Sequence, residues 1–419
     1  MENEDDVTIE LQALLDKDPP IETKRCSIYK VPDQIRQLNV EAYIPNEVSI
    51  GPLHHGDPRR QKMEDHKIFY YKHFIQRSSA SLPELVSCVR KLEPQIRACY
   101  SEKINLTAEE FVKLILVDSA FIIELFYRCQ YTGDDVIVSF QPWLLIMIKY
   151  DLILLDNQLP FFVLEKLYNL AFTLHLNGGH ESSFRHLAFG FFASIFIDEP
   201  PEPADDSNIL HFTDLIRCMY LKQPPCSRED KKLALSYSAN ELAEAGVKFI
   251  VNKPSPNHGC MLDLEFKNGT LKIPHIEVND GTEIWLRNVV ALEQFYYPQE
   301  HYIFDYVRFI GQLINAKKDA GVLIKAGIID YIIGDGNDQS SVAKLFNDIR
   351  KNIVVTSTNV DYLQICDDLN AYYNHPWHSK MATLRRDYFT TPWKTVASIA
   401  GIVLLILTVI QTICSLLQV

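Results

Sequence analysis

Val396 to Leu417 read VASIAGIVLLILTVIQTICSLL, a run without a single charged residue. At about 1.5 Å per residue, a helix of this length spans roughly 33 Å, which is enough for the hydrocarbon core of a bilayer. The run predicts a C-terminal transmembrane helix over 396–417, with the lipid bilayer as a partner and the rest of the chain on one side. A buried core helix is the other interpretation, and the basic residues beside the run disfavour it.

The residues before this run indicate on which side the body lies. Within 380–394 the charged residues are Lys380, Arg385, Arg386 and Lys394, against Asp387 alone. Positive residues beside a span usually stay in the cytosol. The N-terminal sequence MENEDDVTIE lacks the basic and apolar regions of a signal peptide. We therefore expect a single-pass, tail-anchored protein with a cytosolic body, in the endoplasmic reticulum or the plasma membrane. An extracellular receptor body is the disfavoured alternative.

Composition limits the classes of function. Hydrophobic residues make up 47% of the chain and aromatic residues 11%, so a large core is expected and wholesale disorder is excluded. The net charge of −13 argues against nucleic acid as a partner, because phosphate binding needs a basic surface. The nine cysteines are scattered without a CxxC pair, which is typical of reduced thiols rather than of a disulfide framework.

Two segments are expected before the membrane span. Residues 1–25 form an acidic arm, in which 1–18 hold seven acidic residues and one basic residue. Apolar residues in the arm recur at the spacing of one helix face, which predicts a short amphipathic helix; a mostly disordered arm is the alternative. These apolar residues are Val7, Leu11, Leu14 and Leu15. Residues 26–390 form the body, with a candidate lobe boundary at the acidic, proline-rich linker 198–208.

The pattern of the body is mainly helical. Thr107 and Glu110 form a capping box before the apolar run FVKLILVDSAFIIELFYR, which predicts a helix buried on all sides. Alternation on either side of Asn268-Gly269 predicts one β-hairpin with a type I′ turn. Further helices are expected at 60–77, 81–100, 143–155, 160–170, 208–221, 229–249, 280–295, 300–328, 339–352, 359–373 and 378–389. The predicted fold class is mainly α: a large multi-helix body with one small β-hairpin, plus the transmembrane helix.

Histidines are the first candidates for chemistry. His54 and His55 are adjacent, and His66 and His73 follow seven residues apart, so that the latter two share a helix face. An enzyme alternative combines the first three of these histidines with Asp156 in a metal-dependent or acid–base site. No HExxH motif occurs and adjacent histidines point in different directions, so a structural role in bonding turn backbone is favoured. Replacing His54 and His55 is then expected to damage folding.

Carboxylates inside the buried helix are the second candidates. Asp118 and Glu124 are six residues apart, which places them about 120° apart around the helix, so they do not face one site. Glu124 and Arg128 at i, i+4 predict an ion pair instead. Asp118 is expected to join Asp156 and Asn157 in a buried polar network. GxSxG and P-loop motifs are absent from the sequence, so we assign no catalytic, cofactor-binding or metal-binding residue.

Several phrases of the sequence carry a family resemblance. They are Ile28-Tyr-Lys-Val-Pro32, Tyr43-Ile-Pro45, Val48-Ser-Ile-Gly-Pro-Leu-His-His-Gly56, Met63-Glu-Asp-His-Lys67, Leu155-Asp-Asn-Gln-Leu-Pro-Phe-Phe-Val-Leu-Glu165, Glu241-Leu-Ala-Glu-Ala-Gly-Val-Lys248, Arg287-Asn288 with Glu293-Gln294, and Tyr388-Phe389 with Pro392-Trp393. Through them the chain resembles, over 26–417, the plant family catalogued as domain of unknown function 247. The resemblance implies a membrane-anchored plant protein without established enzyme activity, and it supplies no catalytic residues. Some relatives are proposed determinants of self-incompatibility, a role that the resemblance does not carry over to this chain.

The function expected from these observations is that of a non-enzymatic, membrane-anchored protein for interaction, recognition or signalling, with an unidentified protein partner and no cofactor. Within the span, Ala397 and Gly401 form a small-xxx-small pair that allows close helix approach and so permits self-association, although a single such pair is common. Gln411 could hydrogen-bond across such a helix pair. The alternative function is an enzyme built on the His/Asp site described above.

Overall fold

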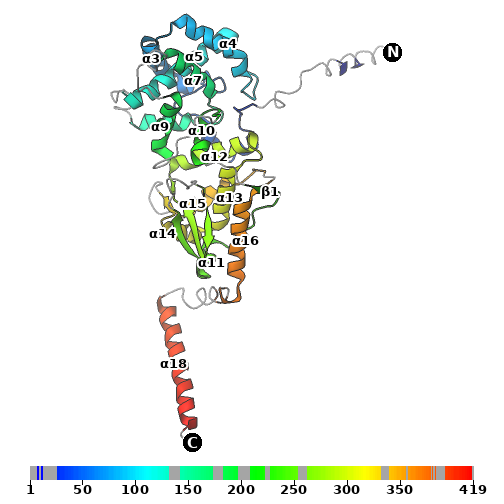
Figure 1. Cartoon of the computed structure of the whole chain (residues 1–419), viewed down its shortest axis with the longest axis vertical. Coiled ribbons are helices and arrows are strands. Elements are labelled where there is room, and N and C mark those ends of the chain that lie inside the picture. Colours follow the sequence, from blue (N-terminus) through cyan, green and yellow to red (C-terminus); the bar gives the residue numbers. More distant parts are fainter. Residues whose placement is uncertain are drawn as a thin grey trace. The chain divides into compact units, whose positions relative to one another are not determined.

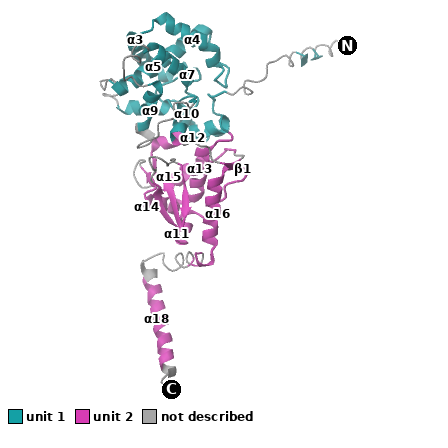
Figure 2. Ribbon diagram, viewed as in Figure 1, with its two compact units in different colours: residues 1–219, 287–297 teal, residues 220–286, 298–419 magenta. Residues whose placement is uncertain are grey.

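The computed structural model describes residues 7–8, 11–12, 26–131, 142–172, 183–196, 208–221, 227–252, 262–331, 339–354, 357–378, 380, 383 and 392–417. The chain divides into two compact units, residues 1–219 with 287–297 and residues 220–286 with 298–419 (Figure 2). The division falls after Met219. The candidate lobe boundary at 198–208 lies outside the described residues, except for Asn208. Helices dominate both units, which confirms the mainly α fold.

The first unit consists of helices around α5, Ala108–Tyr131 (Figure 1). Helix α5 lies at the centre because its residues are apolar nearly all round, so every face of it can be buried. The helices that pack against it are α3 (Gln61–Arg77), α4 (Leu82–Arg97), α7 (Phe161–Ala171) and α9 (Phe184–Phe196). The unit also contains α2 (Asp33–Arg36), η2 (Val40–Tyr43), η3 (Pro58–Arg60), α6 (Pro142–Asp151), α10 (Phe212–Tyr220) and the later turns of α12 (Asp280–Phe295).

Specific contacts fix α5 towards both of its ends. The predicted capping box is confirmed: Thr107 N donates to the Glu110 carboxylate at 3.0 Å, and Glu110 N donates to Thr107 Oγ1 at 3.3 Å. Towards the other end, Phe126 stacks on Phe191 of α9 with ring centroids 4.1 Å apart and meets Phe212 of α10 at 5.5 Å. Aromatic pairs of this kind add about 0.5–1.5 kcal/mol each beyond the burial of their area.

The second unit combines helices with small sheets. Strands β2 (Lys248–Asn252), β4 (Thr270–Pro274) and β3 (Glu265–Lys267) form a mixed sheet in that order, with β2 parallel and β3 antiparallel to β4. Strand β1 (Arg228–Glu229) pairs antiparallel with β7 (Thr358–Asn359), and β5 (Ile276–Val278) pairs parallel with β6 (Ile329–Tyr331). The helices of this unit are α11 (Ala239–Glu244), α13 (Tyr302–Leu313), α14 (Lys317–Lys325), α15 (Gln339–Ile349), α16 (Val360–Asn374) and the first turns of α12.

The hairpin predicted at Asn268-Gly269 is confirmed as β3 and β4. The φ angles of Asn268 and Gly269 are 51° and 72°, and a type I′ turn requires both to be positive. A Cβ on Gly269 would lie 2.8 Å from Tyr372 Oη, so the glycine also lets α16 approach the turn. The hairpin forms part of a larger sheet, because β2 pairs with β4 on the side opposite β3.

The helix expected over 229–249 is wrong. The structure has the short α11 in this region, with β1 before it and β2 after it. Ser238 and Glu241 form the capping box that starts α11, and Gly246, at a φ of 102°, follows its end. The next residues, Lys248–Asn252, pair with β4, which lies later in the chain. This segment therefore forms a strand rather than a helix, and local periodicity alone does not reveal which of the two it forms.

Helix α18, Pro392–Leu417, confirms the helix expected at the C-terminus. Its segment Val396–Cys414 is long and apolar enough to cross a membrane, and none of that segment is buried in the structure. Leu404 and Leu405 expose 63% and 67% of their surface. Exposed apolar area is unfavourable in water by about 25 cal/mol per Å², so a contiguous apolar helix surface calls for an apolar environment.

The acidic arm and the stretch before α18 are described only in part. In the acidic arm, Val7, Thr8, Leu11 and Gln12 are helical, and Val7 and Leu11 are 55% and 56% exposed. The predicted arm residues Leu14 and Leu15 lie outside the described residues, as does most of the helix expected at 378–389.

Candidate functional site

Segment 46–51 of the first unit is largely buried backbone whose N–H groups are accepted by side chains. The N–H groups of 46, 47 and 48 donate to the Asp151 carboxylate at 2.7, 2.7 and 2.8 Å. The Ile50 N–H donates to Asn157 Oδ1 at 2.7 Å. Buried backbone donors need partners, and side chains here supply what a neighbouring strand supplies in a sheet.

Lys67 and Asp118 form a buried ion pair against this segment. Lys67 Nζ lies 2.8 Å from Asp118 Oδ1 and 2.8 Å from Glu64 Oε1, and it also donates to the Ser49 carbonyl. The Gly51 N–H donates to Asp118 Oδ2 at 2.8 Å. Desolvation by burial lowers the pKa of Lys67, but the carboxylates of Asp118 and Glu64 more than offset this effect, so the pKa lies above its ordinary value. Lys67 is therefore a buried cation.

Asp156 is, after Asp151 and Asp118, the third buried carboxylate that contacts this region. The Arg36 guanidinium donates to Asp156 Oδ2, and His54 Nε2 lies 3.2 Å from Asp156 Oδ1. The side chain of Asp156 is 1% exposed and that of His54 is 17% exposed. These contacts fix the first part of the loop 52–59. Its far end is fixed by Arg60, which donates to the Pro45 carbonyl at 2.6 Å.

The tip of loop 52–59 faces solvent. Asp57 accepts hydrogen bonds from Arg59 N at 3.0 Å and Arg59 Nη2 at 2.7 Å, and it pairs with Arg60. The hydrogen bonds from Arg59, its side chain first, hold the pKa of the Asp57 carboxyl far below its usual range. The loop is thus fixed both by the buried contacts of His54 and Arg60 and by the hydrogen bonds within its own turn. Its exposed residues are His55, Gly56, Pro58 and Arg59.

Turn 155–158 lies against segment 46–51, and its side chains hydrogen-bond to backbone carbonyls of that segment and of the residues just before the turn. Asn157 Nδ2 donates to the Val48 carbonyl at 3.0 Å, and Gln158 Nε2 donates to the Leu152 carbonyl at 2.6 Å. Gly51 has a φ of 71°, and a Cβ at this position would lie 2.6 Å from the Gln158 carbonyl oxygen. Glycine is therefore required for the two backbones to come this close.

The structure separates the histidines that the sequence groups together. His54 contacts Asp156, whereas His55 is exposed, His66 is half-buried on α3, and His73 Nδ1 bonds a carbonyl of its own helix at 2.9 Å. In the part of the chain that the structure describes, no group of three or more His, Cys, Asp or Glu side chains is placed to hold a metal ion. The structure thus brings together His54 and Asp156 of the four residues in the enzyme alternative. A role in folding falls to His54 rather than to the exposed His55.

The carboxylate predictions are confirmed in part. Glu124 pairs with Arg128 at 2.7 Å, as its spacing predicts, and Arg77 joins the pair at 3.1 Å. Segment 46–54 contacts all three side chains of the predicted network, but through different residues. Asp118 accepts from Gly51, Asp156 contacts His54, and Asn157 accepts from Ile50.

Two members of this buried cluster were missed by the sequence reasoning, namely Lys67 and Asp151. Lys67 lies on the α3 face formed by Met63, Tyr70 and Phe74, and these three neighbours are apolar and buried. This position in the sequence pattern could have indicated that Lys67 is buried too. A cation at the centre of such a face needs a buried anion. For Asp151, the signal is a carboxylate at the end of the apolar helix α6.

His211, in the same unit, is a buried and neutral histidine. Its Nε2 lies 2.9 Å from the Ser27 carbonyl oxygen, and its Nδ1 faces the Asp214 N–H at 3.4 Å. These partners assign the proton to Nε2, because only the protonated nitrogen can donate to a carbonyl. Desolvation by burial lowers the pKa of His211 to about 4.

His211 should make the protein acid-labile. Below pH 6.5 the unfolded chain takes up a proton that folded His211 refuses until about pH 4. Stability that is present at neutral pH is therefore lost as the pH falls, by about 1.4 kcal/mol per pH unit in this window. The variant His211→Gln should lose this part of the slope in urea unfolding measured from pH 7 to 4.5. A constant difference between variant and parent over this range would contradict a neutral histidine here.

Comparisons with known proteins identify relatives over nearly the whole chain. The model of a family described as "Plant protein of unknown function", DUF247, matches residues 28–407. The UPF0481 protein At3g47200 of Arabidopsis thaliana is 30% identical over an alignment 427 residues long, gaps included, and this alignment covers 94% of this chain and 87% of the relative. The putative UPF0481 protein At3g02645 of the same plant is 22% identical over 490 residues, covering 93% and 90%. No solved structure matches the chain.

Proposed function

Because this chain belongs to the DUF247 family of plant proteins, whose function is unknown, we propose a role from its own geometry: a non-enzymatic, membrane-anchored protein that binds another protein. The observation that carries the proposal is loop 52–59. The buried partners Asp118, Asp156 and Arg60 hold the backbone around the loop, while its tip is exposed. A loop that is ordered before binding loses little conformational entropy on contact with a partner.

The membrane part of the proposal is supported by α18. Its exposed apolar surface and the basic residues of 380–394 favour a single-pass tail anchor with the body in the cytosol. The membrane would then be that of the endoplasmic reticulum or the plasma membrane. A helix of this kind would tether the body to the membrane.

Topology in microsomes tests the anchor. The sequons at Asn105 and Asn268 are useful reporters because both asparagines are exposed. We expect the body to be digested by added protease and both sites to stay unglycosylated, with Asn105→Gln as the control for any shift in mass. A protected, glycosylated body would overturn the cytosolic orientation and make cell-surface recognition the leading function.

Cross-linking in native membranes tests the binding role of the loop. A photoreactive amino acid at His55 should give a discrete adduct with a second protein, and Arg59→Glu in the same chain should reduce that adduct several-fold. The same photoreactive group at Glu102, which is exposed outside the loop, is the matched control. Equal adducts from both positions would contradict a binding site at the loop.

The His54–Asp156 contact is the observation that favours an enzyme as the second candidate, since a carboxylate can orient a histidine for proton transfer. Stoichiometric zinc or iron in the purified chain would promote this candidate. So would a robust hydrolytic turnover that Asp156→Asn abolishes. Metal-free protein without turnover would leave the binding role.

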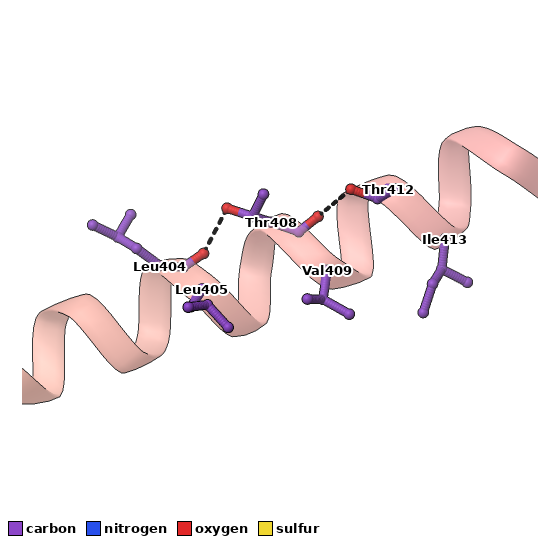
Figure 3. Close-up of a pocket in the computed structure, with 6 residues that line it drawn as sticks. All are labelled: Leu404, Leu405, Thr408, Val409, Thr412 and Ile413. Carbon is purple, nitrogen blue, oxygen red and sulfur yellow. Dashed lines mark hydrogen bonds between the residues drawn. The ribbon is translucent and has the colours of Figure 1, made fainter.

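We also propose that α18 pairs with a second copy of itself. Thr408 and Thr412 lie on one face of the helix, and their hydroxyls donate to the carbonyls of Leu404 and Thr408 at 2.8 Å each (Figure 3). Ala397 and Gly401 fall on this same face at 3.6 residues per turn. Small side chains along one face allow two helices to approach closely in a bilayer.

A bulky residue at Gly401 should weaken this pairing. The variant Gly401→Ile is expected to reduce the cross-linked dimer in membranes several-fold, because the branched side chain separates the two backbones. Ile406→Leu, on the opposite face, is the matched control and should leave the dimer unchanged. A similar loss in both variants, or in neither, would contradict pairing through this face.

A further inference from the structure

Helices α4 and α7 of the first unit form a shallow groove with an apolar floor and a basic rim. Leu92 and Leu170 contribute to the floor with Cys88, and Lys91 and Lys166 line the same groove. Both lysines are exposed. Among the described residues, neither lysine has a carboxylate partner.

The groove is lined by one acid, Glu84, against two lysines, so its lining keeps a net positive charge. The carboxylate of Glu84 accepts hydrogen bonds from Ser81 N and Ser81 Oγ, both at 2.7 Å, and so caps the start of α4. Two cations beside an apolar floor suit a ligand that is both apolar and acidic. An acidic amphipathic helix has this combination, with its apolar side chains on one face and carboxylates at their edge.

The arm of this chain has the matching chemistry. Residues 1–18 carry seven acids against one base, and the apolar residues Val7, Leu11, Leu14 and Leu15 share one helix face. Val7 and Leu11 are helical and more than half exposed. An apolar helix face left in water gains free energy when it is covered, by about 25 cal/mol per Å².

The arm is also tethered close enough to reach the groove. The N–H groups of Ser27 and Ile28 donate to the Cys99 carbonyl at 3.0 and 2.9 Å, just beyond the end of α4. Lys91 lies eight residues before Cys99, which is about 12 Å along a helix. Residues 16–25 can span up to about 33 Å when extended, more than this distance requires.

We propose that the acidic arm is the internal ligand of the α4–α7 groove, with the face of Val7 and Leu11 on the apolar floor and the carboxylates of the arm against Lys91 and Lys166. The tether makes this an intramolecular contact, so a modest affinity is enough to keep the groove occupied. Any outside partner that uses the groove must first displace the arm.

Disulfide trapping in the full chain tests the contact, with Cys88 as the native probe in the groove. The variant Leu11→Cys should form a disulfide with Cys88 within one chain under mild oxidation, identified by mass spectrometry of the linked peptides. Ile9→Cys, which helix spacing predicts to lie about 160° from position 11, is the matched control and should link several-fold less. Lys91→Glu combined with Lys166→Glu should reduce the Leu11→Cys product several-fold.

Two results would overturn the proposal. Equal linking from positions 9 and 11 would mean that the arm has no defined face against the groove. Links between position 11 of one chain and Cys88 of another would place the arm on a second copy instead.

A second measurement needs no engineered cysteine. Alkylation of Cys88 by a maleimide should be several-fold slower in the parent chain than in the variant Leu11→Asp, because the docked arm shields the thiol. Ile9→Asp, which helix spacing places about 160° from position 11, should alkylate like the parent. Equal rates in all three chains would overturn the proposal.

Discussion

Replacing Lys67 with methionine is expected to lower the free energy of unfolding by about 3–5 kcal/mol, because removal of one partner from a buried ion pair leaves the other charge without compensation. Both side chains of the Lys67–Asp118 pair are 1% exposed, so water cannot take the place of the lost ammonium. The Ser49 carbonyl loses its donor in the same step. Native domains have only about 5–15 kcal/mol of stability in total, so much of the protein should fail to fold at 37 °C.

The measurement is urea unfolding of the detergent-solubilised chain, followed by circular dichroism. Lys62→Met is the matched control, since Lys62 lies on the exposed face of α3 and should change stability by less than about 0.5 kcal/mol. The double variant Lys67→Met with Asp118→Leu should recover part of the loss, because it removes the stranded charge. A single variant as stable as the parent would show that the pair contributes nothing to the fold.

Replacing Asp151 with alanine is the second large effect. The carboxylate accepts the N–H groups of 46, 47 and 48, of which the bond from 48 is buried and the other two are part-buried. An orphaned buried donor costs roughly 1–3 kcal/mol and a part-buried one costs less, so a total loss of about 2–4 kcal/mol is expected. Burial raises the pKa of Asp151 to about 6, with the three N–H donors opposing the rise, so the group is an acceptor-only carboxylate at neutral pH.

The variant Asp151→Asn separates the acceptor role from simple packing. Its side chain has the same shape but one acceptor oxygen, and its NH₂ group would face backbone donors, so it should recover little of the loss. Asp65→Asn, on the exposed side of α3, is the control. Hydrogen exchange of the amides at 46–48 gives the local readout, and both Asp151 variants should exchange these amides much faster than the parent. Unchanged protection there would contradict the proposed bonds.

Local sequence patterns were sufficient for the features that depend on neighbouring residues. The capping box at Thr107, the apolar α5 and the two positive φ angles at Asn268-Gly269 follow from residues within a few positions of one another. The exposed apolar helix at the C-terminus belongs to the same group, since its length and lack of charge are visible in the sequence. The same local reasoning failed at 229–249, where β2 exists because it pairs with β4 later in the chain.

What the sequence by itself determined is therefore the helical class of the body, the hairpin and the apolar C-terminal helix. What only the tertiary structure decided is the buried cluster below loop 52–59. Lys67 meets Asp118 from a different helix, and Asp151 bonds a segment more than a hundred positions earlier in the chain. Pairing of buried charges depends on which elements pack together, and no periodicity within one element encodes that. For the same reason the sequence left open a site of three histidines with Asp156, whereas the fold places only His54 against that carboxylate and leaves His55 in solvent.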